Sequence, residues 1–451
     1  MAIRKITAAA GLWLGLAWVL AGSASPAQEE PADSVIQMVV DLLGDKDLEM
    51  RAVGLQQVRE EVPGEAATKE FAALLPKLPP DARAGLLEAL GDRGDAAARP
   101  AVLEMLGDQQ EAVRAAAQKA LGALGGAADV PLLAGKAAAD SKREKGAARL
   151  SLVRLRGDDV NQAIVSALAG GKPNVRAELL GVLAARGAKE TLPTVIASAE
   201  DPDASVRLAA LGALRFLADE AQVATLVKIL KTAKDPQERG KAELAVLAVC
   251  SRSGQVCAEA IIAGLGDADV PSRIALLHTL ARAGGQKALA EVVARLKDDD
   301  QAVRDEALRM LSIWADPAAV EHLRAVAQNG ESPRGQVLAI RGLVRQASPQ
   351  GEKPADLKVL AEAMSLAKRP QEKRLVLGVL GGVATPESLA LVTPAIDQPG
   401  LADEAGLAAV MIAEKIGSGD KNTVRPALEK VLKGAKSQQL RQRAQKVLDS
   451  L

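Results

Sequence analysis

One stretch of the chain, residues 201–218, recurs with variation over almost its whole length. It begins with Asp201, carries Arg207 six residues later, and continues with apolar residues at helical spacing. Taking that arginine as an anchor, thirteen equivalent positions follow one another at spacings of 30 to 37 residues, most often 31 or 32: Arg51, Arg83, Arg114, Gly146, Arg176, Arg207, Arg239, Arg273, Arg304, Gln336, Lys373, Glu404 and Arg441. Seven residues after each anchor stands an aliphatic residue or methionine: Val58, Leu90, Leu121, Val153, Leu183, Leu214, Val246, Leu280, Leu311, Leu343, Leu380, Met411 and Leu448. A fixed period with a preserved core position is the signature of a repeat array, in which each unit packs on its neighbours.

Each repeat is predicted to be a pair of helices, with the anchor near the start of the second helix. In the repeat around Arg207, residues 192–198 form a short helix opened by Pro193, because a proline's missing N–H costs nothing in a first turn. Pro100, Pro131 and Pro426 take equivalent places. A polar turn at residues 200–204 leads into the second helix, whose apolar face is made of Val206, Ala210, Leu211, Leu214 and Leu217.

Five repeats hold both the turn aspartate and the anchor arginine: Asp45 with Arg51, Asp108 with Arg114, Asp201 with Arg207, Asp267 with Arg273, and Asp298 with Arg304. An aspartate in a turn caps helix N–H groups, and an arginine reaches a carboxylate of its own or a neighbouring repeat. We therefore predict a structural ladder that fixes one repeat on the next. The alternative is a row of cation sites, but these turns lack the glycine and closing glutamate of a calcium loop.

The pattern resembles the HEAT repeat, in the short form also found in phycobiliprotein lyases, over residues 33–451. The resemblance rests on the turn aspartate, on an Ala-Leu-x-x-Leu ending, and on the pairs Val113-Arg114, Val175-Arg176, Val206-Arg207 and Val303-Arg304. It implies an all-α, right-handed α-solenoid of about 13 helical hairpins. Because scaffolds, transport factors, lyases and a few enzymes share such repeats, the resemblance indicates the fold and does not indicate one function.

Residues 1–27 are typical of a secretory signal peptide. Arg4 and Lys5 precede an apolar run, residues 6–22, that ends in small residues. Cleavage is expected before Gln28, which would leave residues 28–451 as a single solenoid in the periplasm or outside a bacterial cell. An uncleaved membrane anchor is the alternative, and only then would the protein contact a membrane.

Composition excludes several functions. The 57 basic and 57 acidic residues balance, and after residue 27 the only aromatic residues are Phe71, Phe216 and Trp314, so stacking platforms for nucleic acid are missing and no nucleic acid partner is expected. The only histidines are His278 and His322, and the chain has no phosphate-binding loop, nucleophile elbow or Cys-x-x-Cys motif. We predict no catalytic residue, no cofactor and no metal.

Cys250 and Cys257 are the only cysteines, and they flank a predicted loop between two helices. In an exported protein this spacing leaves two alternatives open, a disulfide or two buried free thiols.

A partner is expected on the concave wall, which the second helices line in solenoids of this kind. Five residues after the anchors runs a less apolar row. From it we select Lys119, His278, Arg309 and Arg341 as partner-binding residues, together with Arg345, one turn beyond Arg341. The last four of these residues predict a patch that binds anions or carboxylates, and the alternative is an ordinary solvated helix face.

The sequence therefore predicts an exported, non-catalytic scaffold that binds a protein or peptide along its concave face. A lyase-like or chaperone-like helper for a cofactor or chromophore is one alternative. Another is a self-assembling envelope component, joined through the acid-rich residues 29–61 and the base-rich residues 421–446. The oligomeric state is not predicted.

Overall fold

The structure is a computed structural model that describes residues 32–60, 63–330 and 332–451. Within these ranges the chain is helical, and the only extended pairing is an isolated bridge between Gln350 and Lys353. The signal peptide predicted at residues 1–27 lies outside the described residues. The chain divides into two compact units, Met1–Leu124 (unit 1) and Gly125–Leu451 (unit 2). The prediction of a single solenoid over residues 28–451 stays a prediction.

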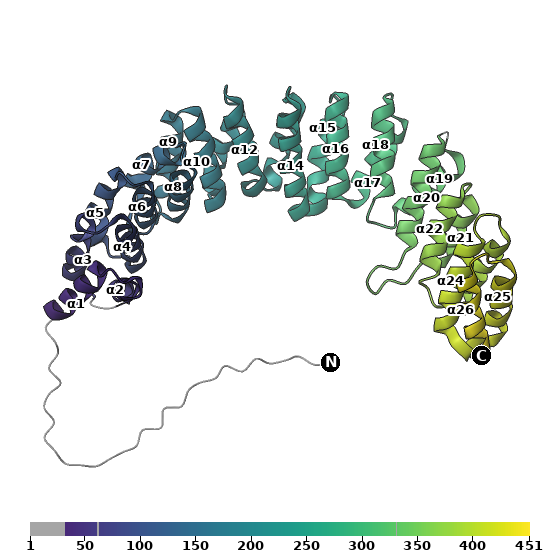
Figure 1. Ribbon diagram of the computed structural model, residues 1–451. Coiled ribbons are helices and arrows are strands. Elements are labelled where there is room, and N and C mark those ends of the chain that lie inside the picture. The colour runs from purple at the N-terminus through teal and green to yellow at the C-terminus, as the bar shows by residue number, and fades with distance from the viewer. Residues whose placement is uncertain (1–31, 61–62, 331) are drawn as a thin grey trace, which may run out of the picture. The chain divides into compact units, whose positions relative to one another are not determined.

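The helices follow one another with short connections (Figure 1). Unit 1 holds α1 (Ala32–Gly44), α2 (Leu48–Glu60), α3 (Glu65–Ala72), α4 (Pro80–Arg93), α5 (Arg99–Glu104) and α6 (Glu111–Leu124). Unit 2 holds α7 (Val130–Ala137), α8 (Lys142–Arg154), α9 (Val160–Gly170), α10 (Pro173–Arg186), α11 (Leu192–Ser198), α12 (Ala204–Leu217), α13 (Val223–Thr232), α14 (Pro236–Ser253), α15 (Ala258–Leu265), α16 (Val270–Ala283), α17 (Gly285–Ala294), α18 (Gln301–Ser312), α19 (Ala319–Asn329), α20 (Pro333–Ala347), α21 (Leu357–Leu366), α22 (Pro370–Leu380), α23 (Pro386–Val392), α24 (Ala402–Ile416), α25 (Lys421–Gly434) and α26 (Gln438–Asp449). Short 3-10 helices extend or link them: η1 (Leu75–Lys77), η2 (Ala96–Ala98), η3 (Met105–Gly107), η4 (Ala127–Asp129), η5 (Lys189–Thr191), η6 (Glu220–Gln222), η7 (Gly254–Cys257), η8 (Arg295–Lys297), η9 (Thr393–Asp397) and η10 (Gly417–Asp420).

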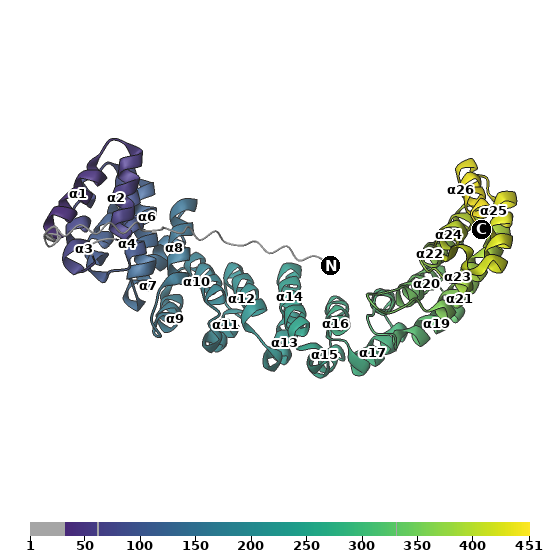
Figure 2. The same ribbon diagram turned by 90° about the horizontal axis from the view of Figure 1, so that it is seen from below.

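Each repeat is an odd-numbered helix followed by an even-numbered one, and all thirteen anchors lie in even-numbered helices. The predicted all-α solenoid of helical hairpins is thereby confirmed. In unit 2 the odd-numbered helices form one layer and α8, α10 and the following even-numbered helices to α26 form the other, which lies on the inner side of the unit's curve (Figure 2). We call this inner layer of unit 2 the second-helix layer. Its members pack side by side, α10 on α12, α12 on α14, and α14 on α16.

The predicted core position seven residues after the anchor is buried in ten repeats, and Val153, Met411 and Leu448 are the partly exposed exceptions. In α8 the buried residue is Leu152, one residue earlier. The helix cap explains the shift: Ser141 caps α8 and lies four residues before Lys145, as Asp203 caps α12 four residues before Arg207. The anchor of this repeat is therefore Lys145 and not Gly146. In α24, Ile412 and Ala413 are fully buried instead of Met411, so the alignment is displaced there too.

Prolines open three first helices as predicted: Pro100 in α5, Pro131 in α7 and Pro193 in α11. The prediction for Pro426 was wrong, since it lies inside α25, which begins at Lys421. The reason is an upstream cap: the side chain of Asp420 accepts a hydrogen bond from the Thr423 N–H and so starts the helix earlier.

Within the described residues, one stretch, Pro236–Leu265, is long and apolar enough to span a bilayer. It consists of α14, η7 and α15 and changes direction at Gly254, whose φ of 60° falls in the left-handed region. Ala245, Val246 and Ile261 of this stretch are fully buried. Part of its apolar surface is thus used in core contacts.

Candidate binding surface

The anchor arginines connect successive repeats at the turns. Arg207 of α12 donates to the main-chain oxygens of Asp201 (2.8 Å) and Pro202 (2.9 Å) in its own turn. The Asp201 carboxylate accepts from Arg176, the anchor of the preceding repeat, at 2.5 and 3.1 Å. Arg207 in turn reaches the Glu238 carboxylate of the next repeat at 2.6 Å. An anchor arginine thus holds its own turn through carbonyl groups and the following repeat through a carboxylate.

The same arrangement occurs in both units. In unit 1, Arg51 donates to the Asp45 carbonyl and the Asp81 carboxylate, Arg83 pairs with Asp108, and Arg114 donates to the Asp108 carbonyl. In unit 2, Arg273 donates to both Asp298 carboxylate oxygens (2.7 and 2.9 Å), and Arg304 donates to the carbonyl groups of Asp298 and Asp299.

Asp267 is the exception among the five predicted pairs. Its side chain, 79% exposed, pairs with Lys231, while Arg273 contacts Asp298 instead. The preceding anchor, Arg239, lies 3.8 Å from Asp269. Asp269 is the cap of α16, so the acid nearest to the ladder in this turn is two residues later than predicted.

The paired aspartates that suggested cation sites are used as caps. Asp201 accepts from the Asp203 N–H at 2.9 Å, and Asp203 accepts from the Ser205 N–H at 2.9 Å. Across residues 32–60, 63–330 and 332–451, no group of three or more His, Cys, Asp or Glu side chains is arranged to hold a metal ion.

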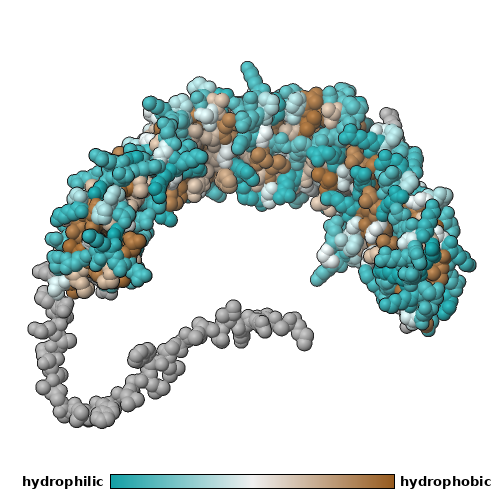
Figure 3. Space-filling view, in the orientation of Figure 1, coloured by the Kyte–Doolittle hydropathy of each residue, from teal (hydrophilic) through white to brown (hydrophobic). Residues whose placement is uncertain are grey.

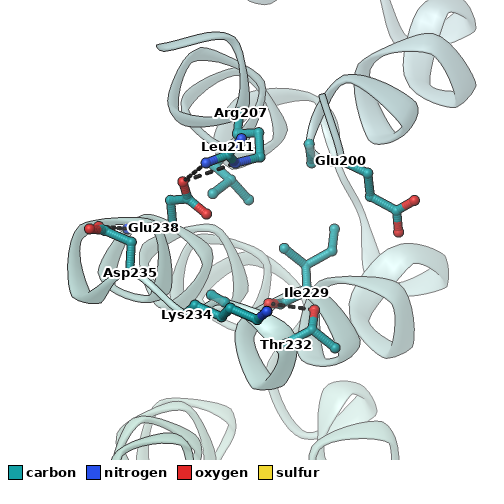
Figure 4. Close-up of a pocket in the computed structure, with 10 residues that line it drawn as sticks. Glu200, Arg207, Leu211, Ile229, Thr232, Lys234, Asp235 and Glu238 are labelled. Carbon is teal, nitrogen blue, oxygen red and sulfur yellow. Dashed lines mark hydrogen bonds and ion pairs between the residues drawn. The ribbon is translucent and has the colours of Figure 1, made fainter. Parts of the chain in front are cut away.

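A cleft of about 300 Å³ lies beside the ladder, between the turn before α12 and the turn before α14. The ion pair of Arg207 and Glu238 forms one wall of the cleft, and Ile229, Thr232 and Lys234 line the opposite wall (Figure 4). Its arginine is already bonded to Glu238 and to two carbonyl groups. The arginine in its wall is therefore already used by the ladder.

A cluster of four charged side chains joins three neighbouring second helices. His278 of α16 makes hydrogen bonds through Nδ1 to Glu243 of α14 (2.6 Å) and through Nε2 to Glu306 of α18 (2.7 Å). Arg309 of α18 donates to Glu306 at 2.8 and 2.9 Å. We call Glu243, His278, Glu306 and Arg309 the histidine cluster.

The cluster's hydrogen bonds change the ionisation of its members. Those to Glu243 and Glu306 raise the pKa of His278 to about 9, against burial, which lowers it. Burial would raise the pKa of Glu306, but hydrogen bonds from His278 and Arg309 lower it to about 2. At neutral pH the imidazolium donates to both glutamates, and the two cations and two anions cancel. The cluster is therefore a neutral cross-link, and the anion-binding patch predicted from the sequence stays a prediction.

The other selected cations lie outside the histidine cluster, Arg341 and Arg345 one turn apart on α20 and Lys119 in unit 1. Arg345 donates to the main-chain oxygens of Ile313 and Trp314, the latter at 2.6 Å. Lys119, in unit 1, pairs with Glu88 at 3.1 Å. Arg341 is exposed on α20. His278 and Arg309 lie 3.2 Å apart, between Nε2 and a guanidinium nitrogen.

Arg345 belongs to a second structural row that the sequence analysis did not identify. In this row an arginine near the end of one second helix donates to the last carbonyl groups of the preceding second helix: Arg93 to Val58 (2.8 Å), Arg186 to Leu152 (2.9 Å), Arg252 to Ala218 (2.6 Å) and Arg345 to Trp314 (2.6 Å). A cation near a helix C-terminus was the available signal.

The second-helix layer also carries exposed apolar residues, which Figure 3 shows as brown patches within a hydrophilic surface. With the anchor of α8 corrected to Lys145, the position five residues later holds Leu150 (39% exposed), followed in the next repeats by Gly181, Gly212 and Leu244 (43% exposed). We call these four residues the apolar row. Phe216, at the end of α12, is 66% exposed. The misplaced anchor concealed the row, because it put Ser151 in place of Leu150.

Cys250 and Cys257 are free thiols in the structure, and each is 1% exposed. Cys250 lies within the last turn of α14, which runs to Ser253, and not in a loop. Burial raises the pKa of both thiols.

We expect these thiols to react with iodoacetamide at neutral pH about tenfold more slowly, or slower still, in the folded protein than after unfolding, because the thiolate is the nucleophile and both groups are buried. Reaction at equal rates before and after unfolding would contradict the buried arrangement. Thiol titration of the unfolded protein without reductant then distinguishes the two alternatives, since a disulfide leaves no thiol to titrate.

Comparison with known proteins agrees with this architecture. The sequence model of the family described as HEAT repeats matches residues 68–153, 161–246 and 258–350, more than half of the chain. No curated protein matches the chain in sequence. The lyase form of the repeat stays a prediction.

Similar solved structures include three of Kap121p. The complex with Ste12p is 13% identical with a TM-score of 0.53, the match covering 92% of this chain and 53% of that one. The complex with Nup53p is 14% identical with a TM-score of 0.54 and the same coverage, and the complex with Pho4p is 13% identical with a TM-score of 0.53, covering 93% and 54%. This chain thus spans about half the length of Kap121p, and at such identities the likeness concerns the fold alone. With the repeat period, the paired helices and the family match taken together, the chain belongs to the HEAT-repeat family.

Proposed function

We propose that this protein is an exported, non-catalytic scaffold that binds a protein or peptide partner on the second-helix layer of unit 2. The observation that carries the proposal is the apolar row with Phe216: apolar side chains stand exposed on the layer that also holds the histidine cluster, whose charges are paired within the protein. Exposed apolar patches with polar rims are typical of protein interaction sites. The similar Kap121p structures are complexes with proteins, which agrees with this use of the fold.

Export is part of the proposal and is supported by the basic and apolar pattern of residues 4–22. It predicts a mature protein in the envelope or secreted fraction whose first residue is Gln28. A protein recovered from the cytoplasm with Met1 in place would contradict export and leave the binding proposal standing.

Site-directed photo-crosslinking tests the binding surface. A crosslinking amino acid at Leu244, in the second-helix layer, is expected to form a discrete adduct with one protein when the intact chain is irradiated in the native envelope fraction. The matched control is Leu132 of α7, in the other layer, which is 42% exposed against 43% for Leu244. Adducts of equal yield at both positions, or no protein adduct at Leu244, would contradict the proposal.

A further inference from the structure

A groove of about 490 Å³ runs between α10 and α12 in the second-helix layer. Its floor contains the two glycines of the apolar row, and the residues beside them are mostly alanines. At Gly212 an added Cβ atom would meet nothing within 4 Å, whereas at Gly181 it would lie 3.3 Å from an Arg149 guanidinium nitrogen. The floor is therefore open above Gly212, and Arg149 lies over Gly181.

Apolar side chains stand around this opening. Phe216 lines the groove and is 66% exposed, although large aromatic side chains usually contribute to the core. Leu150 and Leu244 continue the apolar surface into the repeats on either side. Four second helices at the usual packing distance span roughly 30 Å. About nine residues of extended chain would cover that distance.

The charged side chains beside the groove are mainly basic. Lys145 and Arg149 come from α8, and Arg215 of α12 lies with its guanidinium carbon 5.7 Å from the centre of the Phe216 ring. The carboxylate lining the groove, Glu178, is 19% exposed, is bonded to Lys145 at 2.6 Å and lies 3.8 Å from Arg149. At the other end of the apolar row, Glu243 is bonded to His278. Three cations therefore stand beside the groove against one carboxylate, and this excess of positive charge favours an acidic ligand.

We infer that this groove binds a short protein segment that seats an apolar side chain above Gly212, against Phe216, and places carboxylates next to that side chain, where Arg149 and Arg215 pair with them. The inference rests on the proposed function and names the chemistry of the partner segment. Apolar burial supplies the affinity, and the arginines select acidic flanks over basic ones.

Selection from a phage-displayed library of random twelve-residue peptides tests the inference with the mature full-length protein. We expect enrichment of sequences that carry one or two large apolar residues flanked by Asp or Glu. Synthetic versions with Lys in place of the acids, or Ser in place of the apolar residues, should bind at least about tenfold more weakly in fluorescence anisotropy. No enrichment, or enrichment of basic peptides, overturns the inference.

The variant Gly212→Leu fills the groove from within. Because its Cβ position is open and the residue is helical without a positive φ, the substitution should leave the circular dichroism spectrum unchanged and the Tm at least as high as in the unmodified protein. We expect the variant to bind the selected peptides with an affinity lower by about tenfold or more. Gly378→Leu is the matched control, since Gly378 holds the same position in α22 and also has open space. Equal binding by both variants overturns the inference.

The two proposals fail separately. If the Leu244 crosslinker captures a protein and Gly212→Leu leaves that capture unchanged, the scaffold function stands and the groove is not the docking site. If no protein is captured at Leu244, the scaffold function itself fails.

Discussion

Replacing Asp298 with alanine is expected to lower the free energy of unfolding by about 3 kcal/mol, as for other buried charge pairs that lose one partner. The Asp298 side chain is 1% exposed and accepts from Arg273 at 2.7 and 2.9 Å, from the Asp300 N–H at 3.1 Å and from Arg295 at 3.4 Å. Without the carboxylate, the Arg273 guanidinium remains at the interface between two repeats with no anion. The loss should appear as faster amide hydrogen exchange in α16 and α18 and as a lower urea midpoint.

The matched control is Asp267→Ala. Asp267 also stands six residues before an anchor arginine, but its side chain is 79% exposed and pairs with Lys231, so we expect a loss below about 1 kcal/mol. Equal losses for the two variants would show that position in the repeat matters more than burial of the acid.

Asp298 also predicts how acid affects this part of the chain. Burial would raise its pKa, but hydrogen bonds from the Asp300 N–H and Arg295 lower it below the ordinary value of 3.8. A carboxyl group with a lowered pKa stabilises the folded state above its unfolded pKa, and that stabilisation is lost as the pH falls through the folded pKa. Acid unfolding should therefore begin below about pH 4 and be less steep in the Asp298→Ala variant.

The histidine cluster is expected to make the stability of unit 2 fall as the pH rises from 6.5 to 9. The pKa of His278 is raised from 6.5 to about 9. A raised pKa means that the folded state binds the proton more tightly than the unfolded state, so the stabilisation is complete below pH 6.5 and is lost as the pH passes through 9. The side chain is 26% exposed, so we expect on the order of 2 kcal/mol, less than the full shift implies.

Two variants separate this effect from the rest of the chain. His278→Gln should remove the slope of stability between pH 6.5 and 9, and His322→Gln, the other histidine, on α19 and outside the cluster, should retain it. Urea unfolding at several pH values measures the slope. In the unmodified protein, one of the two imidazole signals in the NMR spectrum should titrate near pH 9. A slope that survives His278→Gln would assign the pH dependence to other groups.

The repeat period predicted the helix pairs because it depends on local properties: a cap, a first-turn proline and an apolar face. Thus Val206 and Leu214 were placed on the core side of their helix, and both are fully buried. At two anchors, Gly146 and Glu404, the phase of the repeat was wrong, and for the first of them the cap at Ser141 was the better guide.

Contacts between repeats were harder to predict. The sequence left open whether an anchor arginine reaches an acid of its own or of a neighbouring repeat; Arg176 bonds to Asp201, 25 residues away, because stacking brings one anchor beside the next turn. The histidine cluster was missed for a related reason. Glu243 lies four residues after its anchor and Glu306 two residues after its own. The row that we followed in the sequence takes the fifth residue after each anchor, so it contains neither glutamate. Side chains that reach diagonally between helices are seen only when the helices are packed.

The ladder has a mechanical consequence. Each of its links joins only adjacent repeats, so a load along unit 2 passes through the links in series. From Arg176 to Asp298 these links are largely ionic, whereas further along Lys373 donates to the neutral amide of Gln398 at 2.8 Å and Lys368 to that of Gln336 at 3.2 Å. A hydrogen bond from a lysine to a neutral amide lacks the charge–charge attraction of an ion pair. From α22 to α24 the ion pair between Arg374 and Glu404 (2.6 Å) adds an ionic link. We therefore expect the turn edge to yield most readily under load between α20 and α22, and a partner bound at α10 and α12 would rest on a stiffer section.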